Sequence, residues 1–169
     1  MNKRKLGRPA DQRMAMLKSQ VSALLWYGKI ETTFDRAKEV SRMAEKYLTL
    51  AIKTYDDTVE VTKEKVNMKN EKVAVKFVID GPKKLAARRK LMASLYDLKE
   101  IKGEKESKSQ YAARTKDIKH PLIEKIFNVY APKYAKRKDE KGQGGGYTRI
   151  LKLGKRRGDD AEAAIIELV

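Results

Sequence analysis

The protein has 169 residues, of which 40 are lysine or arginine and 23 are acidic, and its formal net charge is +17. A chain this basic is typical of proteins that bind nucleic acid or an anionic membrane surface. Because it has no cysteine and one histidine, the composition excludes disulfides and a thiolate metal site and favours an intracellular protein without a bound metal or cofactor.

The positive charge is concentrated in three segments. Residues 1–29 hold seven bases against one acid, residues 81–96 hold five bases and no acid, and residues 133–157 hold ten bases against two acids. The remainder is slightly negative. This clustering predicts three surfaces that face a polyanion, and lysine-rich faces that are merely solvated are the simpler alternative.

Residues 1–10 are predicted to form a basic arm, because they show no apolar periodicity and contain a glycine and a proline. Such an arm is often disordered alone and orders on RNA, and a frayed tail is the alternative. Asp11 is a candidate N-cap for a helix over residues 12–27, where apolar residues recur on one stripe. Arg13 lies off that stripe and is expected to face a partner.

A short β-branched run predicts a strand over residues 30–33, whose last threonine is a candidate N-cap for a second amphipathic helix ending near Lys53. In residues 54–80 acids slightly outnumber bases. Two β-prone runs, 58–62 and 73–79, predict a hairpin there that is not the main RNA surface.

A third helix is predicted over residues 82–96, with a proline at its start. Its expected apolar side consists of Leu85, Arg89, Met92 and either Leu95 or Tyr96. The other side is strongly basic, so one face is expected on the core and the other on phosphate. A membrane-surface helix is the rival, which the scarcity of bulky apolar residues disfavours.

Residues 97–118 mix charges densely and are expected to form a mobile, partly helical loop. The apolar periodicity predicts a further helix over residues 122–130 that ends near the proline at position 132. Residues 133–141 are then expected to be a basic connector.

Residues 142–161 are the stretch on which the functional interpretation rests. Four of the first five residues are glycine, which lets backbone approach a partner closely. A strand over 147–153, a basic turn over 154–158 and a second strand over 163–169 predict a β-hairpin with cations at its tip and base. The interpretation fails if the hairpin's arginines are tucked against the protein's own carboxylates.

Catalytic chemistry is not indicated. His120 directly precedes a proline and is expected to begin a helix, not to act as a catalyst. The glycine run is followed by a strand, where phosphate-loop and dinucleotide motifs require a helix. The enzymatic alternative is a metal-dependent nuclease using Asp159, Asp160 and Glu162. Local pairing of these acids with neighbouring arginines is simpler, so the chain is expected not to be an enzyme.

The chain also contains distinctive strings: Arg4-Lys5-x-Gly7-Arg8, Lys29-Ile30-x-Thr32-Thr33, Leu48-Thr49-Leu50-Ala51, Gly145-Gly146-Tyr147-Thr148-Arg149-Ile150-Leu151-Lys152 and Ile166-Glu167-Leu168-Val169. Together they resemble the family of the bacterial large-subunit ribosomal protein numbered seventeen. The similarity covers roughly residues 1–53, 82–96 and 120–169, and the string that begins at Gly145 is its specific part.

The resemblance implies a single two-layer α/β (α+β) domain over residues 1–169, in the order α-β-α-α-α-β-β with a small mixed sheet. Periodicity gives the same order once residues 54–80 are set aside. The resemblance further implies a non-catalytic, cytoplasmic ribosomal component that binds large-subunit rRNA and neighbouring ribosomal proteins, without a cofactor, membrane or small-molecule substrate. Segments 54–80 and 97–118 exceed the family pattern and are expected to be insertions.

We therefore expect a structural rRNA-binding protein of the bacterial large subunit, whose phosphate contacts fix position more than they read sequence. A non-ribosomal RNA- or DNA-binding architectural protein is the alternative. Tyr147 either stacks on a base or packs in the core. The residues expected to contact RNA are Lys3, Arg4, Lys5, Arg8, Arg13, Lys83, Lys84, Arg88, Lys90, Gly145, Gly146, Tyr147, Arg149, Lys152, Lys155, Arg156 and Arg157.

Overall fold

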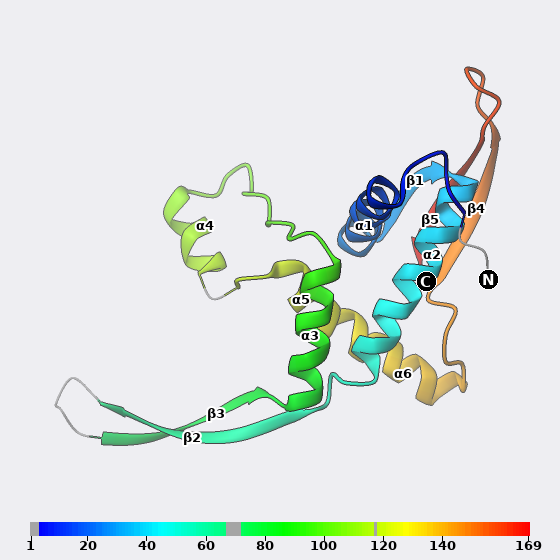
Figure 1. The fold of residues 1–169 in the computed structure, drawn as a ribbon. Helices are drawn as coiled ribbons and strands as arrows, with labels where there is room; N and C mark the ends of the chain where they lie inside the picture. The colour runs from blue at the N-terminus through cyan, green and yellow to red at the C-terminus, as the bar shows by residue number, and fades with distance from the viewer. Residues whose placement is uncertain (1–3, 67–71, 117) are drawn as a thin grey trace.

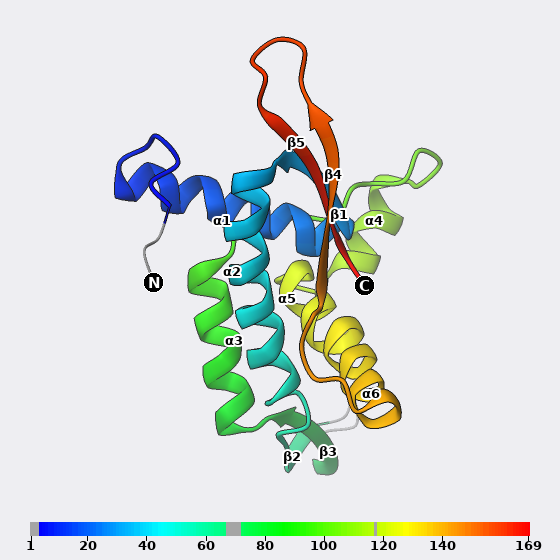
Figure 2. The ribbon, with the colours of Figure 1, turned by 90° about the vertical axis from the view of Figure 1, so that its right-hand side faces the viewer.

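The computed structural model describes residues 4–66, 72–116 and 118–169. A three-stranded sheet lies beside a group of helices, and a two-stranded ribbon projects from the opposite end of that group (Figures 1 and 2). Helices and strands therefore form separate layers and not alternating units. The predicted α+β class is confirmed.

Helix α1 (Ala10–Tyr27) buries most of the predicted apolar stripe against the core. It begins directly after Pro9, so Asp11 lies in the first turn and is not the N-cap. The helix ends at Gly28, whose φ of +84° is a left-handed conformation that glycine adopts without steric cost. The Gly28 N–H donates to the Leu24 carbonyl at 2.8 Å, which closes the last turn.

Strand β1 (Lys29–Thr33) and helix α2 (Phe34–Ile52) begin and end within one residue of the predicted positions. Thr33 precedes α2 as expected, but its side chain accepts no capping hydrogen bond. The residues of α2 buried in the core are Ala37, Val40, Ala44, Leu48 and Ala51. The helix therefore uses the stripe that its sequence periodicity predicts.

The predicted C-terminal hairpin is formed by β4 (Thr148–Lys155) and β5 (Glu162–Leu168). The strand order is β1-β5-β4, with β5 antiparallel to both neighbours. The expected mixed sheet is therefore wrong: β5 returns from the hairpin tip and inserts beside β1, so both pairs are antiparallel. Ile166, at the centre of β5, is fully buried.

The predicted hairpin in residues 54–80 is confirmed as the projecting ribbon of β2 (Thr58–Val66) and β3 (Lys72–Asp80) (Figure 1). Its connecting residues lie outside the described ones. At the ribbon's base the Asp57 carboxylate accepts hydrogen bonds from the backbone N–H groups of Lys83 and Lys84, at 2.8 and 3.2 Å. These groups begin α3, so Asp57 caps that helix from outside it.

Helix α3 (Pro82–Ser94) begins at the predicted proline, but the expected apolar side is partly wrong. Ala87 and Leu91 are the buried residues of the helix, and Leu85 and Arg89 are exposed. Met92, also on the expected side, is partly buried and packs against the core. Leu95, just beyond the helix, is buried as predicted.

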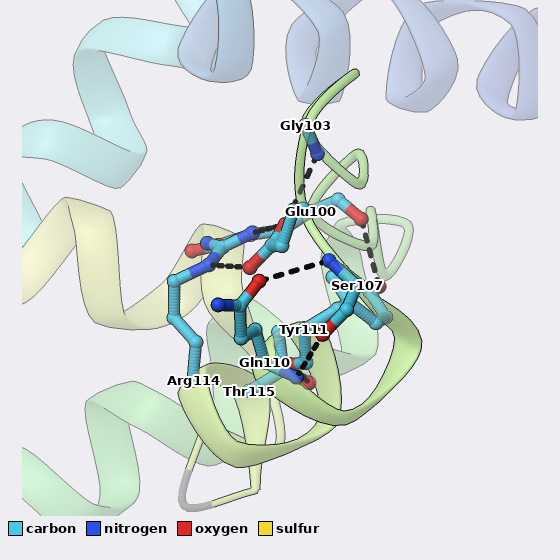
Figure 3. Close-up of polar contacts among 8 residues, drawn as sticks. Glu100, Gly103, Ser107, Gln110, Tyr111, Arg114 and Thr115 are labelled. Atoms are coloured by element: carbon cyan, nitrogen blue, oxygen red, sulfur yellow. Dashed lines mark hydrogen bonds and ion pairs between the residues drawn. The ribbon is translucent and has the colours of Figure 1, made fainter.

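Segment 97–118 is partly helical, as expected, through α4 (Lys108–Thr115). Ser107 and Gln110 form a reciprocal capping box at its start (Figure 3). Arg114 pairs with Glu100 and Glu106, and the Tyr111 hydroxyl donates to the Glu100 carbonyl at 2.9 Å. These contacts fold the segment on itself, without one buried residue in α4.

The predicted helix end near Pro132 is wrong. Helix α5 (Pro121–Lys125) continues through the π-helical turn η1 (Ile126–Tyr130) into α6 (Ala131–Lys141). The Ala131 N–H donates to the Ile126 carbonyl five residues earlier. A widened turn relieves the clash between a proline ring and the preceding turn, so the helix continues. Residues 133–141 are therefore helical and not a connector.

Candidate nucleic-acid interface

The N-terminal arm is partly docked on the body of the protein. Lys3 lies outside the described residues. Arg4 pairs with Asp35 at the start of α2, and Leu6 packs against the core. Lys5 and Arg8 are exposed, so the arm presents some of its cations to solvent while one apolar side chain anchors it.

Two of the expected RNA contacts on α3 are engaged within the protein. Lys84 pairs with Asp80 at 3.2 Å, and Arg88 bridges Asp80 and Glu124. The Lys84 and Arg88 side chains are 12% and 17% exposed, so these cations are largely withdrawn from solvent. The expectation that they face phosphate is not supported, because they join the ribbon base and α5 to α3.

Lys83 and Lys90 differ from these two. Both are exposed, and neither has a salt bridge to another residue in the described part of the chain. They belong to the solvent side of α3 and leave a smaller basic face than the sequence predicts.

Tyr147 is a core residue, so the alternative in which it stacks on a base is not supported. Its ring centroid lies 4.8 Å from that of Tyr134 on α6, and only 5% of the residue is exposed. The guanidinium of Arg137 lies 5.1 Å from the Tyr134 ring centroid and 5.3 Å from that of Tyr147. The three side chains form a cation–aromatic cluster that joins α6 to the start of β4.

The same arginine holds the glycine run. Arg137 Nη2 donates to the Gly145 carbonyl at 2.5 Å and to the Gly146 carbonyl at 3.3 Å. Both glycines have positive φ, +99° and +60°, a conformation that other residues adopt at a cost. Apart from the adjoining residues, no described atom would lie within 4 Å of a Cβ added at either. The glycines are therefore required for backbone conformation, and their outer side is open to a partner.

Four of the five hairpin cations, including two of its three arginines, are paired with the protein's own carboxylates, so their exposure decides whether they are tucked in. Lys155 pairs with Asp160 and Arg156 with Asp159, each at 2.6 Å. Arg149 and Lys152 make looser pairs on the sheet, at 3.6 Å with Glu167 and 3.7 Å with Glu162.

These four pairs are solvent-exposed. The cationic side chains are 52–65% exposed, and exposed ion pairs contribute little to stability and exchange partners readily. Arg157 is exposed, without an ion pair to another described residue. The hairpin thus retains an accessible positive surface, because no cation on it is buried against its acid.

The acids of the hairpin tip, Asp159 and Asp160, are already paired with neighbouring cations. Hydrogen bonds from Arg156 and from the Ala161 N–H lower the pKa of Asp159, and Asp160 holds Lys155. Across residues 4–66, 72–116 and 118–169, no group of three metal-ligating side chains could hold an ion. The local pairing that the sequence suggested is therefore what these acids do.

Burial raises the pKa of Tyr134 to about 12, against the opposing attraction of the Arg137 guanidinium. Since a tyrosine in the unfolded chain ionises near pH 10, the unfolded state loses this proton first as pH rises. Folding stability is therefore expected to fall between pH 10 and pH 12. Chemical denaturation of wild type and Tyr134→Phe across that range tests this. The variant should show a shallower alkaline loss, and an unchanged slope would contradict it.

Sequence reasoning missed a second group of cations, on α2. Arg42 and Lys46 lie one turn apart on this helix and line a pocket with Arg4 and Arg13. Their spacing of four residues places them on one helix face, a signal that the sequence contains. Arg137 was missed for another reason: it lies where a connector was expected, so no orientation could be assigned to it.

Of the helices in the described part of the chain, none combines the length and apolar character of a bilayer-spanning segment. The fold and surface together define a small, basic α+β protein whose exposed cations suit a polyanionic partner. The family model described as "Ribosomal protein L17" matches residues 16–169. The chain belongs to this family.

Known members of the family match this chain over nearly its whole length. The chain is 41% identical to the large ribosomal subunit protein bL17 of Lachnospira eligens, with 98% of each chain covered. It is 39% identical to that of Acetivibrio thermocellus and 43% identical to that of Ruminiclostridium cellulolyticum, again with 98% of each chain covered. Because both chains are matched nearly end to end, residues 54–80 and 97–118 lie within the aligned span.

Proposed function

We propose that the protein is a structural constituent of the large ribosomal subunit that holds rRNA through cations on its exposed surfaces. The observation that carries the proposal is the C-terminal unit, in which a braced glycine run with an open outer side leads into a strand pair bearing five accessible cations. Cations of this kind exchange a weak carboxylate partner for phosphate at little cost.

The proposed interface is smaller than the one that composition alone suggests. Lys84, Arg88 and Tyr147 are left out, because internal contacts occupy them. Lys3, which lies outside the described residues, is kept as a further proposed phosphate contact because of its charge. The proposed phosphate and sugar contacts are Lys5, Arg8, Arg13, Lys83, Lys90, Gly145, Gly146, Arg149, Lys152, Lys155, Arg156 and Arg157, with Arg4 contributing if it leaves Asp35. Neighbouring ribosomal proteins are proposed as further partners.

Two measurements test this function. The tagged protein should co-sediment with large subunits through a moderate-salt wash, whereas a loosely bound architectural protein would be washed off. For purified protein and large-subunit rRNA, neutralising about six to eight phosphates predicts a slope of about −5 to −7 for log affinity against log salt. A slope near zero, or loss of the protein in the wash, would refute the proposal.

A further inference from the structure

A pocket of about 310 Å³ lies between α1 and α2, away from the C-terminal hairpin. The two helices cross here (Figure 2). Met14 and Leu17 of α1 and Met43 and Tyr47 of α2 provide apolar and aromatic walls. Pockets of this volume accept small ligands, and methionine and tyrosine side chains adapt well to a flat ring. The walls therefore fit one unstacked nucleobase.

The rim of the pocket is cationic. Arg13, Arg42 and Lys46 line it, and Arg13 and Lys46 have no ion pair to another residue among those described. Two cations without an acidic partner beside an apolar cavity favour a ligand that has both a ring and a negative charge. A nucleotide within an RNA chain has this combination.

Glu39 distinguishes the pocket from a simple phosphate site. The residue is 8% exposed and lines the cavity, and its Oε1 accepts a hydrogen bond from Arg42 Nη1 at 3.0 Å. A carboxylate repels a phosphate group but accepts hydrogen bonds from N–H groups. Adenine, cytosine and guanine each present an exocyclic amino group, whereas uracil presents one N–H between two carbonyl oxygens. The acceptor therefore favours bases that carry an amino group.

We propose that this pocket binds a single unstacked base bearing an exocyclic amino group, inserted from the RNA that the protein contacts. The inference rests on the proposed RNA-binding function. The base lies between the methionines and Tyr47, its amino group donates to Glu39, and the attached phosphate pairs with Arg13 and Lys46. The pocket thereby adds base discrimination to an interface that otherwise reads only backbone.

Methionine methyl groups give a direct test. The full chain, isotope-labelled at these methyls, is titrated by NMR with short uridine-rich RNAs that differ only at the central nucleotide. Met14 and Met43 signals should shift, and Met92, which lines a different pocket, should not. RNAs with central adenosine, cytidine or guanosine should bind about tenfold more tightly than all-uridine RNA, since one good base contact gives about that discrimination.

Two variants separate the groups of the pocket. Glu39→Gln offers a donor as well as an acceptor, so the preference against uridine should shrink to near parity. Lys46→Ala should weaken all four RNAs alike and keep the preference. Equal binding of the four RNAs to wild type, or unshifted Met14 and Met43 signals, would overturn the inference.

Parallel titration with large-subunit rRNA separates this inference from the proposed function. If rRNA binds with the expected salt dependence while the methyl signals of Met14 and Met43 do not shift, only the pocket inference fails. Absence of rRNA binding overturns both.

Discussion

Replacing Arg156 and Arg157 together with glutamate is expected to lower affinity for large-subunit rRNA about 100-fold or more, because hydrogen bonds to charged groups contribute about 1.5–3 kcal/mol each. The salt dependence should weaken by about two phosphate equivalents. The melting temperature should stay close to that of wild type, because both side chains are exposed and neither contributes to the core. Filter binding across salt concentrations and thermal unfolding measure the two effects.

A matched control is the pair Lys102→Glu and Lys105→Glu in the segment before α4. Both lysines are exposed, and the double change lowers the net charge as much as the arginine pair does. If the control weakens rRNA binding equally, total charge and not the hairpin governs affinity. If the arginine variant unfolds instead, these residues stabilise the fold, and the phosphate role assigned to them is wrong.

Sequence patterns correctly predicted the helices and hairpins that are determined by residues close together in the sequence. The stripes of α1 and α2 bury the residues that a period of 3.6 places on one face. In residues 54–80 and 147–169, β-prone runs separated by turn residues correctly predicted two hairpins. In each case the residues that determine the element lie within a few positions of one another, so one sequence suffices.

Failures occurred where the deciding partner is distant or the geometry unusual. Arg88 is withdrawn from solvent by Asp80 and by Glu124, the latter 36 positions away, and composition cannot show such a pairing. The π-turn before Pro132 carries the helix past a residue that ordinarily ends one. Because of that error, residues 133–141 were predicted to be a connector and not α6. The role of Arg137, which holds the glycine run, was therefore not predicted.

The hairpin's ion pairs change how its charge should be understood. Composition suggests unpaired cations that would bind a polyanion, but the structure gives four of the five a carboxylate partner. Such partners lower the repulsion among neighbouring cations on the hairpin. Since exposed pairs are weak, rRNA phosphates at high local concentration can replace the carboxylates. The ion pairs therefore reduce the positive charge of the hairpin surface in the free protein, but they leave the cations accessible to rRNA.

Arg137→Ala is expected to destabilise the protein by about 2–4 kcal/mol, a sum of lost charged hydrogen bonds and cation–π contacts. The guanidinium lies close to the Tyr134 and Tyr147 rings and donates to the Gly145 and Gly146 carbonyls. For a chain of this size the melting temperature should fall by about 5–12 °C. Affinity for rRNA should fall as well, because the released glycine run no longer presents a fixed backbone.

The neighbouring Lys136→Ala supplies the control for this variant, since Lys136 is exposed on the same helix. It removes the same charge and should leave the melting temperature unchanged. Arg137→Lys should recover little, because an ammonium lacks the planar guanidinium that contacts both the Tyr134 and the Tyr147 ring in the wild type. Full rescue by lysine would mean that positive charge alone matters at this position, and the view of Arg137 as the brace between α6 and the glycine run would then be wrong.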